Sequence, residues 1–95
     1  MNMKTSYQQK LQAQLDEWSA EIDILKARAD KADADVKLEY YEQIERLREK
    51  QNTAKDKLTE LIAASDDAWE DLKAGAESAW LTLGDAVSNA TSRFK

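Results

Sequence analysis

The fold is indicated most directly by residues 11–36, which read LQAQLDEWSAEIDILKARADKADADV. Apolar side chains recur there in alternating steps of four and three, which is the spacing of a heptad seam. The seam consists of Leu11, Leu15, Trp18, Ile22, Leu25, Ala29, Ala32 and Val36. Side chains so spaced form a narrow apolar stripe along a helix, and another helix buries such a stripe best. The segment therefore predicts a coiled-coil helix.

The seam continues toward the middle of the chain with one change of spacing. From Val36 the next two steps are both four, to Tyr40 and Ile44, which is a stutter that locally unwinds a left-handed supercoil. Heptad spacing then resumes through Leu47, Gln51, Ala54, Leu58 and either Leu61 or Ile62. No proline or glycine interrupts this stretch. We therefore predict one long helix from about residue 6 to about residue 64.

A second helix start is recognisable just after this stretch. Ser65 or Asp67 can serve as the N-cap, and acidic residues crowd the turn that follows, where the helix dipole favours negative charge. We predict a turn at about residues 64–66 and a second helix over about 66–92. Because neither glycine nor proline ends the preceding helix, the alternative is one unbroken helix about 130 Å long, at about 1.5 Å per residue.

The last third of the chain repeats its apolar residues every eleven positions. The matching pairs are Trp69 and Trp80, Leu72 and Leu83, and Ala76 and Val87. Eleven residues make close to three turns, so these side chains form one nearly straight face. This stretch resembles the amphipathic repeats of exchangeable apolipoproteins and of some desiccation-protective proteins. The resemblance implies a helix that can lie in a membrane interface, although its acidic polar face would repel anionic lipid.

The stripes together predict an all-α fold in which the second helix folds back as an antiparallel coiled-coil hairpin on residues 36–61. This arrangement leaves the stripe from Leu11 to Ala32 uncovered, and an exposed apolar stripe of that length marks an interface. We therefore predict an elongated helical bundle built from a homodimer, with a tetramer as the alternative. The residues predicted to form the hairpin or oligomer contacts are Leu11, Leu15, Trp18, Ile22, Leu25, Val36, Tyr40, Ile44, Leu58, Trp69, Leu72, Trp80, Leu83 and Val87.

Composition argues against chemistry in this chain of 95 residues. It contains no cysteine and no histidine, so thiolate sites, disulfides and the commonest general base are excluded. Four glutamates, Glu39, Glu42, Glu45 and Glu49, follow helical spacing, but bundle metal sites combine such residues with histidine. Neither a phosphate-binding glycine loop nor an activated nucleophile is recognisable. We predict a protein that is not an enzyme and that has no metal, cofactor or small-molecule substrate.

Charge and hydropathy narrow the partners and the location. The net charge is −5, from 14 basic and 19 acidic residues, and no basic stripe exists, so nucleic acid is not expected as a partner. The polar N-terminus has no signal-peptide pattern, and the apolar runs are far shorter than the roughly 20 residues of a membrane span. A cytoplasmic location is therefore predicted.

The whole chain resembles a family of small acidic bacterial coiled-coil proteins that are often labelled as stress-response or uncharacterised. The resemblance is carried by the segments 16–18 (DEW), 23–27 (DILKA) and 68–75 (AWEDLKAG), followed by Trp80. It implies a bacterial cytoplasmic origin and an association with stress, and it brings no functional residue. We predict a self-associating structural or interaction protein with a scaffolding or stress-protective role. The alternative is a peripheral lipid-binding protein.

Overall fold

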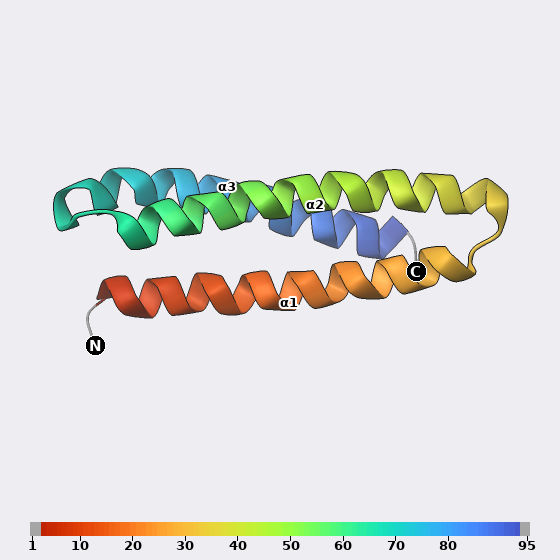
Figure 1. Ribbon diagram of the computed structural model, residues 1–95, viewed down its shortest axis with the longest axis horizontal. Helices are drawn as coiled ribbons and strands as arrows, with labels where there is room; N and C mark the ends of the chain where they lie inside the picture. The colour runs from red at the N-terminus through yellow and green to blue at the C-terminus, as the bar shows by residue number, and fades with distance from the viewer. Residues whose placement is uncertain (1–2, 94–95) are drawn as a thin grey trace.

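The computed structural model describes residues 3–93 and contains three α-helices over that range. They are α1 (Met3–Lys31), α2 (Ala34–Ala63) and α3 (Asp66–Arg93). Consecutive helices are antiparallel and lie side by side along one bundle (Figure 1). The bundle measures 51 × 20 × 18 Å. Its radius of gyration of 15.4 Å exceeds the value of about 12 Å that a rounded domain of this length would have. The prediction of an all-α helical bundle is confirmed, and one chain forms this elongated bundle by itself.

The prediction of one helix over residues 6–64 is wrong, because the chain reverses at Ala32 and Asp33. Asp33 takes an extended conformation, with φ −63° and ψ 153°. The N–H of Ala32 donates to the carbonyl of Ala29 at 3.1 Å, which tightens the last turn of α1. The carbonyl of Asp33 accepts the N–H groups of Val36 and Lys37 at 3.0 and 2.8 Å, which starts α2.

Burial of apolar surface explains why the chain bends there. A continuous helix would leave the stripes of both halves facing water, whereas a two-residue turn lets the first half cover the second. Short-range hydrogen bonds satisfy several of the backbone groups that the break releases. Arg28 and Lys31 end α1 and Asp35 begins α2, so the charges at the break also agree with the two helix dipoles.

The second turn lies where it is predicted, at Ala64 and Ser65. The hydroxyl of Ser65 accepts the N–H of Ala68 at 3.3 Å, and its carbonyl accepts the N–H of Trp69 at 2.9 Å. Ser65, and not Asp67, is therefore the N-cap of α3. Because the three helices have similar lengths, the predicted hairpin of one long and one short helix is not the arrangement found.

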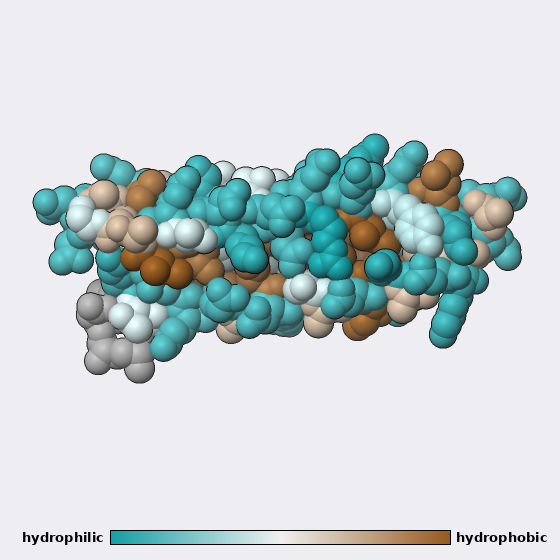
Figure 2. All heavy atoms as spheres, in the orientation of Figure 1, coloured by the Kyte–Doolittle hydropathy of each residue, from teal (hydrophilic) through white to brown (hydrophobic). Residues whose placement is uncertain are grey.

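The core contains the seam residues of all three helices. Five large side chains are less than 2% exposed, and each contributes about 1.5–3 kcal/mol of burial free energy; they are Ile22, Leu25, Leu61, Leu83 and Val87. Of the two alternatives left open by the sequence, Leu61 is buried and Ile62 is 55% exposed. Figure 2 shows that polar side chains cover most of one face, with apolar ones visible in the seam between α1 and α2.

The stripe of α1 that was expected to stay uncovered is buried within a single copy. Leu11 and Leu15 are 4% and 5% exposed, and Ile22 and Ala29 are fully buried. The partners that cover this stripe are α2 and, less closely, α3. A second copy is therefore not required to hide the N-terminal seam, and any self-association of closed chains must use a different surface.

Candidate interaction surface

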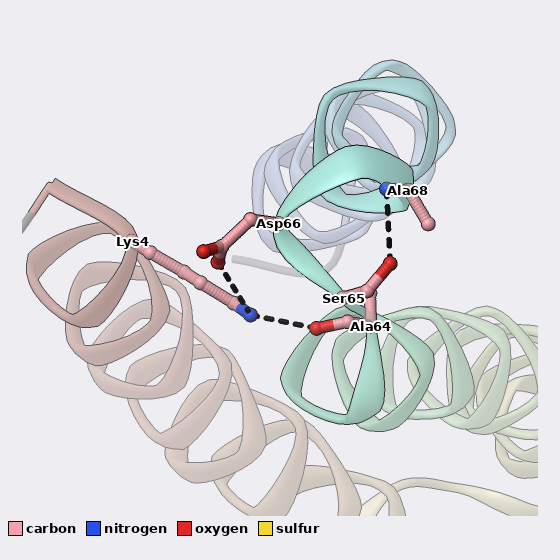
Figure 3. A network of polar contacts seen from close by, with 5 residues as sticks. All are labelled: Lys4, Ala64, Ser65, Asp66 and Ala68. Carbon is pink, nitrogen blue, oxygen red and sulfur yellow. Dashed lines mark hydrogen bonds and ion pairs between the residues drawn. The ribbon is translucent and has the colours of Figure 1, made fainter.

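The start of α1 is fastened to the turn between α2 and α3 (Figure 3). The ammonium of Lys4 donates to the carbonyl of Ala64 at 2.7 Å, and it lies 3.9 Å from the carboxylate of Asp66. Ala64 follows the end of α2, where the helix dipole favours a cation. One lysine thus joins all three helices at this end of the bundle.

Tyr7 makes a second contact between α1 and α3 near the same end. Its hydroxyl donates to Oε1 of Glu77 at 3.1 Å, and its ring meets that of Trp69 edge-on at 5.6 Å. The ammonium of Lys73 lies 5.1 Å from the Tyr7 ring centroid and 5.3 Å from that of Trp69, within range of a cation–π interaction. Burial of the phenol raises the pKa of Tyr7 to about 12, and the hydrogen bond to Glu77 is the second contribution to this rise.

Trp18 packs against Gly84 halfway along the same pair of helices. A Cβ atom at position 84 would lie 3.0 Å from Cζ2 and 3.3 Å from Cη2 of the Trp18 ring. Gly84 therefore allows the indole to approach the backbone of α3. Because Trp18 faces Gly84 while Tyr7 lies between the levels of Trp69 and Glu77, α1 and α3 run parallel and in register.

A groove runs between these two helices, and it is called here the α1/α3 groove. It contains two apolar-rimmed hollows, one toward each end of the bundle. The first, of about 300 Å³, is lined by Tyr7, Lys10, Leu11, Gln14, Glu77, Trp80 and Leu81. The second, of about 130 Å³, is lined by Glu21, Ile24, Leu25, Arg28 and Thr91. A third hollow beside Trp18 and Gly84 lies between them.

Two large apolar side chains stand exposed at this groove. Leu81 is 69% exposed at the rim of the first hollow, and Ile24 is 53% exposed at the rim of the second. Elsewhere, Leu38, Ile62, Val36 and Tyr41 are also more than a third exposed. Leu81 and Ile24 differ from these four because each lines a hollow that an apolar side chain from outside could fill.

The structure places most of the predicted contact residues in the core of one chain. Three of them, Trp18, Tyr40 and Leu72, are partly buried against that core. Val36 is 42% exposed and lies outside that core, so its predicted role in a contact stays a prediction. The buried members are Leu11, Leu15, Ile22, Leu25, Ile44, Leu58, Trp69, Trp80, Leu83 and Val87.

The sequence analysis singles out several residues that line the groove, such as Trp18 and Trp80, but not the two exposed apolar residues at its rim. Leu81 directly follows the buried Trp80 and Ile24 directly precedes the buried Leu25, so neither belongs to the periodic stripe from which contacts are predicted. Gly84 carried one available signal, since a glycine inside a strong helical pattern often marks a close approach. The contacts of Lys4 and Tyr7 join residues at least 60 positions apart, which no local pattern reveals.

The polar groups that line the hollows of the groove include both acidic and basic side chains. The first hollow is lined by the titratable side chains of Tyr7, Lys10 and Glu77. Within residues 3–93, no three acidic side chains come together to hold a metal ion. Over the same range, no helix combines the length and apolar character needed to cross a bilayer.

Comparison with protein-family models, with curated proteins and with solved structures finds no match to this chain. The resemblances to small acidic bacterial coiled-coil proteins and to apolipoprotein-like repeats therefore stay predictions. The α1/α3 groove combines an exposed apolar rim with charged side chains of both signs.

Proposed function

We propose that this chain is a non-enzymatic interaction protein, a small helical bundle that self-associates and serves as a scaffold or protective component. The observation that carries the proposal is the exposure of Leu81 and Ile24 beside unfilled hollows of the α1/α3 groove. Apolar side chains at the rim of a concave surface favour contact with another protein. A bacterial cytoplasmic setting and a link to stress agree with the family resemblance and remain part of the proposal.

The side chains of the groove support a role without catalysis. The two hydroxyls that line these hollows are already held in hydrogen bonds within the bundle, since Tyr7 donates to Glu77 and Thr91 donates to the carbonyl of Val87. Binding of another protein in the groove would bury apolar surface and would require none of these side chains to react. Turnover of a substrate by the purified chain would contradict this part of the proposal.

Self-association is tested by the solution mass over a range of concentrations. Sedimentation equilibrium should show a shift from one copy to two between low micromolar and submillimolar protein. The bundle closes its own core, so the monomer should keep full helical content by circular dichroism after dilution. A mass of one copy throughout the range would contradict the proposal.

The lipid-binding alternative receives less support from the positions of the apolar side chains of α3. Trp69, Trp80, Leu83 and Val87 are all less than 10% exposed, so this face could meet lipid only after the bundle opened. Flotation with neutral and with anionic vesicles separates the two functions. The interaction protein should stay at the bottom of the gradient with both vesicle types, and flotation with either would favour the alternative.

A further inference from the structure

The start of α2 extends beyond the end of α1 and is not covered by it. The hydroxyl of Tyr41 donates to Asp30 at 2.5 Å, so these two residues lie at matching levels of the antiparallel helices. Because α1 ends one residue after Asp30, residues 34–39 of α2 run past its end (Figure 1). Val36 continues the apolar seam within this projecting segment, and it is 42% exposed. The closed chain thus leaves part of its seam without a covering helix.

The turn between α1 and α2 consists of residues that can also continue a helix. The φ of Asp33, −63°, already has a helical value, and it is the ψ of 153° that makes this residue extended. Its side chain makes no capping bond, and residues 3–63 contain neither glycine nor proline. The bond from the N–H of Lys37 to the carbonyl of Asp33 already has the spacing of an α-helix. A straight helix would also pair the terminal backbone groups that the turn separates.

The apolar seam is nearly symmetric about Val36 and keeps its helical phase across the turn. Each seam residue before Val36 has a counterpart at the same distance after it, to within one residue. Such pairs are Ala32 and Tyr40, Ala29 and Ile44, Leu25 and Leu47, Trp18 and Ala54, and Leu11 and Leu61. The contacts of Asp30 with Tyr41 and of Asp23 with Arg48 are centred beside the same residue. A two-fold axis at this point would therefore reproduce the pairing of α1 with α2 between two copies.

We propose that two copies of this chain exchange α1 by straightening the turn at Ala32 and Asp33. In each copy α1 and α2 then form one helix about 90 Å long, at about 1.5 Å per residue. Each α1 packs antiparallel to the partner's α2 and parallel to the partner's α3, which is its arrangement within one chain. The contacts of Lys4, Tyr7 and Trp18 form as before, but between copies. Exchange of an identical element is a low-cost route to a dimer for this reason.

The exchange adds a contact that the closed chain does not make. The two-fold axis crosses the continuous helices beside Val36, so the projecting start of each α2 is covered by that of the other copy, and Val36 packs against the partner's Val36. This burial and the continuous helix favour the dimer, whereas the loss of freedom on association favours the monomer. The carboxylates of Asp35 approach each other near the axis, so Asp35→Asn should strengthen the dimer. The dilute chain keeps the closed turn.

Ala34→Pro tests the straight helix. Ala34 is the first residue of α2, and Asp33 already has the extended conformation preferred before proline, so the closed chain should accept the change with its helical content unaltered. Proline inside the continuous helix costs each copy about two factors of ten, so the dimer should weaken by about 10⁴-fold. Asp33→Ala, which favours helix at the turn, should strengthen it by up to about tenfold. Dimer affinity that is unchanged in a folded Ala34→Pro variant would overturn the proposal.

Val36→Ser tests the contact at the axis. Because Val36 is partly exposed in the closed chain, the unfolding of the monomer should change little. The dimer buries both copies of this side chain, so it should weaken by about 30-fold. Leu38→Ser is the matched control, since Leu38 is 66% exposed and lies on the opposite side of the same helix. Equal losses of dimer affinity for the two variants would show that the axis does not lie beside Val36.

The exchange rests on the self-association proposed above, and cross-linking between copies separates the two. Asp23 of α1 contacts Arg48 of α2, and the chain has no cysteine of its own. Copies with Asp23→Cys alone, refolded together with copies with Arg48→Cys alone, should therefore be joined by a short bifunctional maleimide. The same mixture with Ala34→Pro in both copies is the control and should not be joined. A dimeric mass without this link overturns the exchange alone, and a monomeric mass at every concentration overturns both.

Discussion

At the scale of single residues, the contact between Trp18 of α1 and Gly84 of α3 depends on the absence of a side chain at position 84. Gly75 lies in the same helix, and nothing lies within 4 Å of a Cβ placed there. Gly75→Ala should therefore raise the free energy of unfolding by about 0.5–1 kcal/mol, the usual gain of alanine over glycine inside a helix. Gly84→Ala should gain less, or lose stability, because its methyl group meets the rigid Trp18 ring at 3.0 Å.

Urea unfolding followed by circular dichroism measures this difference between two chemically identical substitutions. Both variants remove a glycine from α3, so the helix-propensity gain cancels in the comparison. What remains is the cost of moving Trp18 away from the backbone. Equal gains for the two variants would show that Trp18 does not rest on Gly84.

Tyr7 makes the stability of the bundle depend on alkaline pH. The pKa of its phenol is 10.0 without perturbation and about 12 in the fold, raised by burial and by the bond to Glu77. Because the folded-state pKa lies above the unfolded one, the protonated phenol stabilises the fold fully below about pH 10. That contribution is lost as the pH rises from about 10 to about 12.

Ultraviolet titration of tyrosinate absorbance checks this assignment. Tyr7→Phe should remove the step at the highest pH, and Glu77→Gln should move it to lower pH by removing the negatively charged acceptor. Tyr41 also has a raised pKa, chiefly because its hydroxyl donates to Asp30 at 2.5 Å, so Tyr41→Phe is the matched control. A highest-pH step that does not move in Glu77→Gln would contradict the contact between Tyr7 and Glu77.

At the scale of secondary structure, the two turns differ in how their helices begin. Ser65 caps α3 with its side chain, whereas Asp33 precedes α2 without a side-chain capping bond. Ser65→Ala should lower the free energy of unfolding by about 1 kcal/mol, and Asp33→Ala should cost less. Chemical denaturation of both variants measures the two losses. A larger loss for Asp33→Ala would mean that the first turn depends on its aspartate more than the geometry indicates.

The same two turns explain how far the sequence could predict the fold. The stop after Ala63 was recognised because Ser65 and the acidic residues after it form a strong helix start. The break at Ala32 was missed because the heptad steps continue across it to Val36, and neither glycine nor proline marks it. The apolar spacing indicates which residues are buried, but it does not indicate whether the helix that covers them belongs to the same chain.

The candidate surface was less predictable than the core for a related reason. Periodicity identifies residues that repeat along one face, and ten of the fourteen predicted contact residues are buried. Leu81 and Ile24 lie beside that repeat, so only the packing of α1 against α3 gives them a role. The sequence predicts a dimer from the stripe between Leu11 and Ala32, which the chain covers by itself. The proposal of self-association therefore depends on Leu81 and Ile24 instead.

At the scale of the whole molecule, packing of the core outweighs the ion pairs at the surface. Arg48 pairs with Asp23 at 2.6 Å between α1 and α2, and Arg93 pairs with Glu39 between α3 and α2. These side chains are more than a third exposed, and such pairs contribute about 0–1 kcal/mol each. By contrast, truncation of a buried leucine such as Leu83 to alanine costs about 2–5 kcal/mol.

Thermal unfolding in low and high salt, compared with Leu83→Ala, checks this order. Added salt screens the surface pairs and should change the midpoint by far less than the core truncation does. The comparison should be made at a protein concentration at which the wild type is monomeric. A salt effect as large as that of Leu83→Ala would mean that surface charges hold the helices together.

The central claim is that α1 folds back on α2 within one chain, and the distance between two spin labels tests it most directly. Labels at Gln12→Cys and Thr59→Cys, both exposed, lie at similar levels of neighbouring helices, and dilution with unlabelled protein removes distances between copies. In the monomer, the fold predicts a separation comparable with the 20 Å width of the bundle. A distribution centred near about 70 Å, the span of an unbroken helix at about 1.5 Å per residue, would contradict it.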